Sequence, residues 1–193
     1  MHSKTIFFTN MSDNQITTDI DGVVIDLMPV FEKNGGGVFH MLPGGSLNPD
    51  WFGGSILDVY GFYSNEQHKL RGGHYHPVLN EMFCTVSGTA LWILSDFRPE
   101  SSTYKKTIGI VLGKAKSDRA HNLPSYTIEE TEKHARITVP AGIYHAIAPL
   151  GDQGFIAIAL GTTAFDKDDY RYPTIVEVPN MTSILNQFDI KPE

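Results

Sequence analysis

The sequence contains a single cysteine and few basic residues, and both scarcities exclude classes of function. One cysteine, Cys84, among 193 residues leaves no disulfide framework within the chain and no site built on several thiolates. Cys84 stands in an apolar run, where a small buried hydrophobic residue is the expected role. Lys and Arg number 15 against 22 Asp and Glu, a formal net charge of −7. Nucleic-acid binding generally needs a basic surface, so no nucleic-acid partner is predicted, although one or two arginines can still hold a small phosphorylated ligand.

Long apolar runs are also missing. Residues 1–8 include no extended hydrophobic region and no small-residue cleavage site. The sequence therefore predicts no signal peptide, no membrane span and a cytoplasmic protein.

Helical patterns are nearly absent, and short strands take their place. Only residues 182–188 read as a helix, while 18 Gly and 11 Pro provide many turns. The chain is predicted to be all-β, an antiparallel sandwich or barrel of the jelly-roll kind. Its 193 residues fit one domain, divided into an N-terminal arm (1–20), a barrel (21–178) and a C-terminal tail (179–193). Strands are expected at residues 23–27, 38–41, 55–63, 81–86, 89–95, 104–112, 136–139, 146–148, 154–160 and 176–178, and the polar stretch 113–132 is expected to be irregular and able to cover a pocket as a flap.

The strongest functional pattern is a set of metal-ligating residue types. His74 and His76 are two positions apart, so in an extended strand their side chains share one face. Glu81 follows shortly, and His145 comes from a distant Pro-x-Gly turn. Three imidazoles and one carboxylate suit one divalent transition metal, Fe, Mn, Ni, Zn or Cu, better than a cation that prefers oxygen alone.

The spacing of these residues resembles the two motifs of the cupin superfamily. His-x-His, four residues, Glu, six residues and Gly fit positions 74–88, and Pro-x-Gly-x-x-His fits positions 140–145. The resemblance implies a double-stranded β-helix barrel with the metal ligands His74, His76, Glu81 and His145. The glycines expected at positions 68 and 134 are histidines here.

A narrower resemblance begins at Asp96-Phe97-Arg98, followed by Ser101-Ser102-Thr103-Tyr104. Together with residues 70–75 and 137–145, this pattern is similar to the dTDP-4-dehydrorhamnose 3,5-epimerase family of cupins. That family removes and returns a proton beside the carbonyl of a keto-deoxy sugar linked to dTDP. The resemblance implies catalytic roles for His74, as base, and for His145, and it places Arg71 near the phosphates.

The sequence departs from that family at several positions. Leu160 stands where the family has its acid tyrosine, Glu81 replaces a pocket lysine, and Trp92 replaces an acidic residue. No counterpart of the aspartate that orients the base is found near the C-terminus.

The arginine and two histidines at positions 71–76 also resemble the metal-free cupin ketoisomerases of nucleotide-linked sugars. Asn80 and Glu81 resemble a metal-binding carbohydrate-modifying cupin domain of capsule-synthesis proteins.

Two chemistries compete for His74, because a ring nitrogen that gives its lone pair to a metal cannot also accept a proton as a base. If metal is bound, another base is needed, and Tyr60, Tyr63 and His121 are the candidates. Arg71 either anchors an anion or satisfies carbonyls in the turn before the motif, and Trp92 either binds substrate by stacking or fills the core.

We therefore predict a homodimeric, metal-binding cupin enzyme of the epimerase or isomerase type. Its substrate would be a keto-deoxy sugar nucleotide of polysaccharide or secondary-metabolite biosynthesis. Two alternatives stay open, an Fe(II)-dependent cupin dioxygenase and a non-catalytic sugar-binding cupin.

Overall fold

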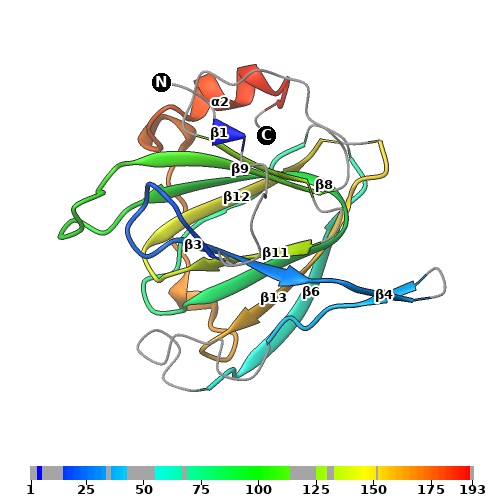
Figure 1. Ribbon diagram of the computed structural model, residues 1–193. Coiled ribbons are helices and arrows are strands. Elements are labelled where there is room, and N and C mark those ends of the chain that lie inside the picture. Colours follow the sequence, from blue (N-terminus) through cyan, green and yellow to red (C-terminus); the bar gives the residue numbers. More distant parts are fainter. Residues whose placement is uncertain are drawn as a thin grey trace.

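Two β-sheets face each other and share one long strand in the computed structural model (Figure 1). The structure describes residues 4–5, 15–33, 36–42, 55–66, 69–113, 125–129, 133–150 and 152–191. One sheet contains β1 (Lys4–Thr5), β7 (Arg71–His74), β8 (Glu81–Asp96), β9 (Thr107–Gly113), β10 (Ser125–Glu129) and β12 (Ile143–Pro149). The other contains β2 (Gln15–Thr17), β3 (Val24–Pro29), β6 (Asp58–Ser64), β11 (Lys133–Val139), β13 (Phe155–Gly161) and the first half of β8. This arrangement confirms the predicted all-β jelly roll.

The shared strand β8 replaces the two strands expected at residues 81–86 and 89–95. It runs without interruption from Glu81 to Asp96 and changes sheets at its middle. Gly88, at the change, has φ +81°, and a Cβ there would collide with the Gly154 carbonyl oxygen. A glycine at this position therefore lets one strand bend between two sheets, so no turn is needed.

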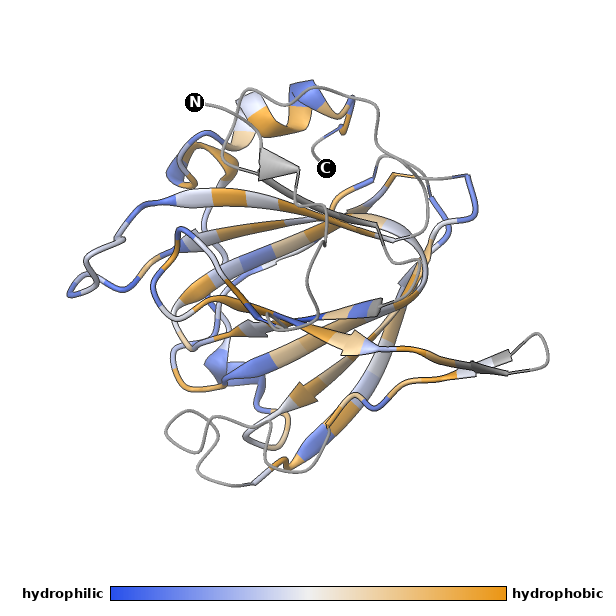
Figure 2. Cartoon of the chain, in the orientation of Figure 1, coloured by the Kyte–Doolittle hydropathy of each residue, from blue (hydrophilic) through white to orange (hydrophobic). Residues whose placement is uncertain are grey.

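The hydrophobic core lies between the two sheets, and a second apolar layer lies outside one of them. Ala90, Trp92 and Leu94 of β8 point into the core, while Leu91 and Ile93 point outward beneath α2 (Met181–Gln187). Figure 2 shows apolar colouring along the strands and on α2, with hydrophilic residues in several loops. The short C-terminal helix expected at 182–188 is confirmed, and its buried side chains cover the outer face of the sheet.

Side-chain hydrogen bonds hold the loop after β8, and the next strand begins later in the sequence than expected. Arg98, Ser101 and Thr103 each donate a side-chain hydrogen bond to the Asp96 carboxylate. Burial alone would raise the pKa of Asp96, but these bonds outweigh it and lower the pKa to about 2. The strand expected from residue 104 therefore begins only at Thr107. The Asp-x-Arg pattern that resembles the epimerases thus has a structural role here.

Three further segments differ from expectation. The strand expected at 176–178 is a 3₁₀ turn, η2 (Ile175–Glu177), because the Thr174 N–H and hydroxyl both donate to the Glu177 carboxylate. Part of the expected irregular stretch forms β10, which pairs in parallel with β9; the rest lies outside the described residues. β2 and the buried Ile20 belong to the barrel, although the arm was expected to reach residue 20.

A small hairpin of β4 (Phe31–Lys33) and β5 (Gly36–Val38) projects from the barrel (Figure 1). No helix in the described part of the chain has the length and apolar character needed to cross a membrane.

Candidate metal and substrate site

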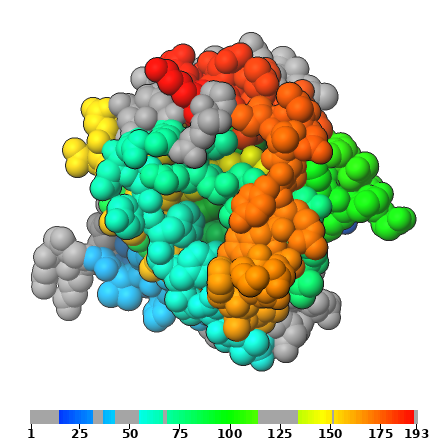
Figure 3. Space-filling model, turned by 180° about the vertical axis from the view of Figure 1, so that it is seen from behind, coloured from blue at the N-terminus to red at the C-terminus, as the bar shows by residue number. Residues whose placement is uncertain are grey.

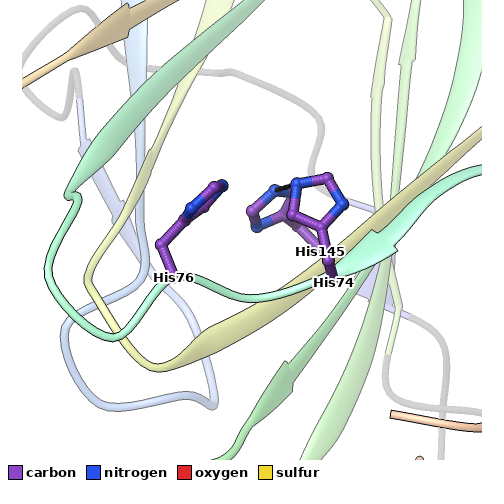
Figure 4. A group of neighbouring side chains, drawn as sticks. All are labelled: His74, His76 and His145. Carbon is purple, nitrogen blue, oxygen red and sulfur yellow. Dashed lines mark hydrogen bonds between the residues drawn. The ribbon is translucent and has the colours of Figure 1, made fainter. Parts of the chain in front are cut away.

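Three histidines from separate parts of the motifs meet inside one end of the barrel. His74 ends β7, His76 lies in the following loop, and His145 lies on β12, where it pairs with His74 (Figure 4). One ring nitrogen from each lies within 4.8 Å of the other two. Tyr75, between the first two, points the opposite way and stacks on Phe97, as the two-residue spacing predicts.

Two glycines bring His74 close to His145. Gly72 and Gly73 have φ of +79° and +80°, a conformation that L side chains rarely adopt. A Cβ at Gly72 would lie 3.1 Å from the carbonyl oxygen of His145, so the β7 backbone could not approach β12 as closely with another residue there. The pairing register also shifts between His145 and Ala146. These local features aim the His74 ring at His145.

Glu81 lies beside the histidines and is buried, with 1% of its surface exposed. Its Oε2 is 3.6 Å from His76 Nε2 and 3.4 Å from His145 Nε2. Its Oε1 accepts a 2.5 Å hydrogen bond from the Tyr60 hydroxyl. Burial raises the pKa of Glu81, and His76 and the Tyr60 hydrogen bond offset only part of this rise. A buried carboxylate in this position needs positive charge nearby to remain ionised.

His74 and His145 do not supply that charge as protons. Burial, together with the neighbouring imidazoles, lowers the pKa of His74 to about 3, and burial and His76 do the same for His145. Both rings are therefore neutral near pH 7. A neutral imidazole is the form that ligates metals.

Backbone carbonyls hold the Nδ1 atoms of His76 and His145, which face away from the centre of the cluster. His76 Nδ1 donates to the Asp169 carbonyl at 2.9 Å, and His145 Nδ1 contacts the Ile143 carbonyl at 3.2 Å. With Nδ1 protonated, the Nε2 lone pair of each ring points inward. His145 Nε2 then lies 3.2 Å from His74 Nε2, the contact drawn as a dashed line in Figure 4. His76 Nε2 is buried and has no hydrogen-bond partner among the residues that the structure describes.

These observations fit a cation at the centre of the cluster. Inward lone pairs, a buried carboxylate and an unpartnered buried nitrogen are costly alone, and a divalent metal would satisfy all of them. His74, His76 and His145 could therefore hold a metal ion, with Glu81 next to two of them.

Asp169 supports His76 and was not identified as a site residue from the sequence. Its carboxylate accepts from the backbone N–H groups of Val78 and Leu79, at 3.0 Å each, and its carbonyl binds His76. The loop is held on β7 by paired backbone bonds between Tyr75 and Arg171. Local sequence carries no sign of this contact, because the two partners lie 93 residues apart.

A pocket of about 320 Å³ opens beside the cluster. It is lined by Asp58, Tyr60, His76, Leu79, Gly161, Thr163, Ala164, Phe165, Asp166, Asp169 and Tyr170. In Figure 3 the orange segment after β13 lies next to the cyan β6, and these two parts provide most of the lining. The Tyr170 ring is 4.3 Å from the His76 ring and 4.8 Å from the His74 ring, between centroids. Tyr170 is a site residue that the sequence analysis did not identify.

The two predicted substrate-binding residues lie away from this pocket lining. Arg71 has a half-exposed side chain that approaches Glu66 at 3.7 Å. Trp92 is 1% exposed, packs on Phe62 and Phe83, and donates to the Thr85 hydroxyl. The position of Trp92 favours the core-filling alternative over direct stacking on a substrate.

The three residues considered as alternative bases, Tyr60, Tyr63 and His121, differ in their positions relative to the site. Tyr60 faces the site, and its pKa is raised by burial and by Glu81. Tyr63 is 68% exposed on the opposite face of β6. His121 lies outside the described residues. Leu160 is 5% exposed and packs in a small cluster with Met82, so no hydroxyl occupies that position on β13.

Comparison with known proteins identifies the fold. No family model and no curated protein matches the sequence. Among solved structures, a dTDP sugar isomerase from Desulfovibrio desulfuricans G20 is similar with a TM-score of 0.68 and 16% identity, covering 85% of this chain and 92% of that one. A variant of ChmJ, a 3'-monoepimerase from Streptomyces bikiniensis, solved with dTDP, matches with a TM-score of 0.69 and 16% identity over 92% of this chain and 80% of its own.

A third similar structure is dTDP-6-deoxy-D-glucose-3,5-epimerase from Legionella pneumophila Philadelphia 1, solved in complex with dTDP-4-keto-L-rhamnose. Its TM-score is 0.68 at 14% identity, covering 93% of this chain and 87% of that one. The chain therefore has the jelly-roll fold of the dTDP-sugar epimerase cupins, as the sequence resemblance implied. At these identities, the likeness establishes the fold and not the reaction.

Proposed function

We propose that this chain, which has the fold of dTDP-sugar epimerases, is a metal-dependent isomerase or epimerase acting on a nucleotide-linked keto-deoxy sugar. The observation that carries the proposal is the buried Glu81 carboxylate, 3.4 Å from His145 Nε2 and 3.6 Å from the unpartnered His76 Nε2. Similar structures that bind or convert dTDP-sugars support the substrate class.

The chain would hold the metal with His74, His76, His145 and Glu81. A divalent ion there would polarise a substrate carbonyl and so make the proton on the neighbouring carbon easier to remove. His76 would be kept in its ligating tautomer by the Asp169 carbonyl, and Glu81 would be kept in place by the Tyr60 hydroxyl. The partly enclosed pocket would hold the sugar over this centre and exclude bulk water.

Proton transfer would then fall to groups that line the pocket and are not ligands. Asp58 and Tyr60 are on the same face of β6, and both line the pocket. Asp58 could accept a proton, and the Tyr60 hydroxyl could donate one to the substrate in place of the tyrosine missing at Leu160. Both residues lie on β6, which pairs with β13. The resemblance to the epimerase family places that family's acid tyrosine on β13, at the position of Leu160.

A second candidate, a sugar-binding cupin without catalysis, is favoured by one observation. Leu160 is packed against Met82, so the expected acid is absent from β13. In this reading Tyr60 serves only to support Glu81.

Metal content measured by plasma mass spectrometry on untagged protein tests the metal site. We expect near-stoichiometric metal in the parent protein, and a marked loss in Glu81→Ala. Glu100→Ala, which removes an exposed glutamate from the loop after β8, is the matched control and should keep its metal. Absence of metal from both parent and control would contradict the site and return His74 and His76 to proton transfer.

Turnover is tested separately by incubating the metal-loaded protein with a dTDP-4-keto-6-deoxy sugar in deuterated water. Deuterium appearing next to the carbonyl supports the isomerase or epimerase. Metal retention and sugar binding with no deuterium uptake would instead support the binding protein. Consumption of oxygen would point to the dioxygenase alternative.

A further inference from the structure

The Pro-x-Gly turn is hydrogen-bonded to both ends of the loop that follows the first two histidines. The Gly142 N–H donates to the His76 carbonyl at 2.7 Å, and the Ala141 N–H donates to the side-chain Oδ1 of Asn80 at 2.9 Å. Asn80 directly precedes Glu81 at the start of β8. Two successive N–H groups of the turn are thus held by the loop that carries two of the proposed ligands.

The backbone of Asn80 is itself held by Thr162, the residue that follows β13. The Asn80 N–H donates to the Thr162 hydroxyl at 3.1 Å, and the Thr162 N–H donates to the Asn80 carbonyl at 3.1 Å. The next residue, Thr163, lines the pocket. Asn80 therefore joins three segments that are distant in the sequence: the loop after β7, the turn before β12 and the end of β13.

The turn needs these bonds because it passes from one sheet to the other. β11 pairs with β8 in one sheet as far as Val139, and β12 pairs with β8 in the other sheet from Ile143 onward. Residues 140–142 lie between these two ladders. The bonds to His76 and Asn80 therefore hold the part of the chain that leads to the third histidine.

The position of the turn matters to the metal site because the turn leads to one of its ligands. His145 follows Gly142 by three residues, and its Nε2 lies 3.4 Å from Glu81 Oε2. Ligand atoms must lie within about 0.2 Å of their ideal distance from an ion. A small shift of the turn would therefore change how many side chains reach the same ion.

We propose that Asn80 is a positioning residue for the metal site: its Oδ1 holds the Pro-x-Gly turn and so sets the distance between Glu81 and His145. Asn80 is not one of the proposed ligands, and it acts through the backbone of Ala141. Its importance for activity rests on the proposed function, whereas its effect on the turn can also be measured without metal.

Cobalt(II) binding tests this role, because the visible spectrum of bound cobalt reports the coordination geometry. The full-length protein is stripped of metal and titrated with Co(II) against a competing chelator. Asn80→Ala removes the acceptor, and we expect a ~10-fold or greater loss of Co(II) affinity with a changed spectrum. Asn80→Asp keeps an oxygen acceptor and should bind Co(II) at least as tightly as the parent protein, since its added charge also favours a cation.

Two further variants separate positioning from a general loss of stability. Ile184 packs in the apolar layer beneath α2, outside the sheet, so Ile184→Ala should lower the urea midpoint and keep the parent affinity and spectrum. Thr162→Val removes the hydroxyl that accepts from the Asn80 N–H, and should weaken Co(II) binding by a smaller factor than Asn80→Ala. Thr162→Val also provides the test if Asn80→Ala does not fold.

The proposal is overturned if folded Asn80→Ala keeps the parent affinity and spectrum, if Asn80→Asp loses as much affinity as Asn80→Ala, or if Ile184→Ala does. It is equally overturned if Asn80→Ala does not fold and Thr162→Val binds Co(II) like the parent protein. Failure of the parent protein to bind Co(II) would overturn the proposed metal site alone. The ring ¹⁵N shifts of His145 in the metal-free protein then decide the role of Asn80: we expect them to change in Asn80→Ala and not in Asn80→Asp, and unchanged shifts in both would refute it.

Discussion

The hydroxyl of Tyr60 provides the sharpest test of the candidate metal site, because it contacts the site through one bond. Tyr60 Oη donates to Glu81 Oε1 at 2.5 Å, while the other carboxylate oxygen faces His76 and His145. Tyr60→Phe deletes this hydrogen bond and keeps the ring that packs near Phe62. The change leaves every proposed ligand in place.

The expected magnitude follows from the burial of Glu81. A hydrogen bond to a charged group contributes about 1.5–3 kcal/mol, and its loss leaves one oxygen of this buried carboxylate without its donor. Residues that orient metal ligands from outside typically contribute ~10- to 100-fold to metal affinity, and we expect a loss of that size in Tyr60→Phe.

Competition against a chromophoric chelator at fixed pH measures this affinity. Tyr63→Phe is the matched control, because Tyr63 lies on the same strand with its side chain exposed on the other face. We expect Tyr63→Phe to bind metal like the parent protein. If Tyr60→Phe binds metal as tightly as this control, Glu81 is not held by Tyr60 in the metal-bound protein and the reasoning fails.

Three further predictions concern the stability of the fold, each measured by urea denaturation. The pKa of Asp96, lowered to about 2 from an ordinary 3.8, contributes about 2 kcal/mol of stability that is present above pH ~4 and lost as the pH falls through 2. Asp96→Asn should therefore cost at least that much at pH 7 and much less at pH 2, and equal costs would refute this account. Gly88→Ala should cost more than ~3 kcal/mol, because φ +81° and a collision with the Gly154 carbonyl act together, and a mild effect would contradict the bend in β8. Ile184→Ala should cost about 2–4 kcal/mol, since this α2 side chain is 1% exposed, whereas the exposed Thr182→Ala should cost little.

The fold and the histidine cluster were predictable from the sequence for a common reason. Alternation of side chains along a strand places His74 and His76 on one face, and the Pro-x-Gly turn brings back His145. These are local rules, and the jelly roll follows from many short strands with almost no helix. The site residues recognised from spacing are the ones that the structure brings together.

The parts that could not be predicted depend on contacts between distant segments. Asp169 supports His76 from 93 residues away, and Tyr170 reaches the cluster because backbone bonds hold its loop on β7. The single long β8 was divided in two because Gly88 reads as a turn, while the structure uses its positive φ to pass between sheets. The sequence leaves stacking on a substrate and core filling open for Trp92, and only the packing shows that Phe62 and Phe83 occupy the space around it.

The tautomers of the histidines bear on the choice between metal ligation and proton transfer. A base that removes a proton from carbon needs a pKa near the working pH, whereas the pKa of His74 is lowered to about 3 by burial and by its two imidazole neighbours. A base in such a site usually has an acidic partner that stabilises its protonated form. The nearest carboxylate, Glu81, instead faces His76 and His145. Neutral rings with inward lone pairs are poor proton acceptors at pH 7 and good ligands, so the same burial that weakens His74 as a base favours it as part of a metal site. Asp58 and Tyr60 line the pocket side of the cluster and are not proposed as ligands, so they are the remaining candidates for the proton transfer that an isomerase requires.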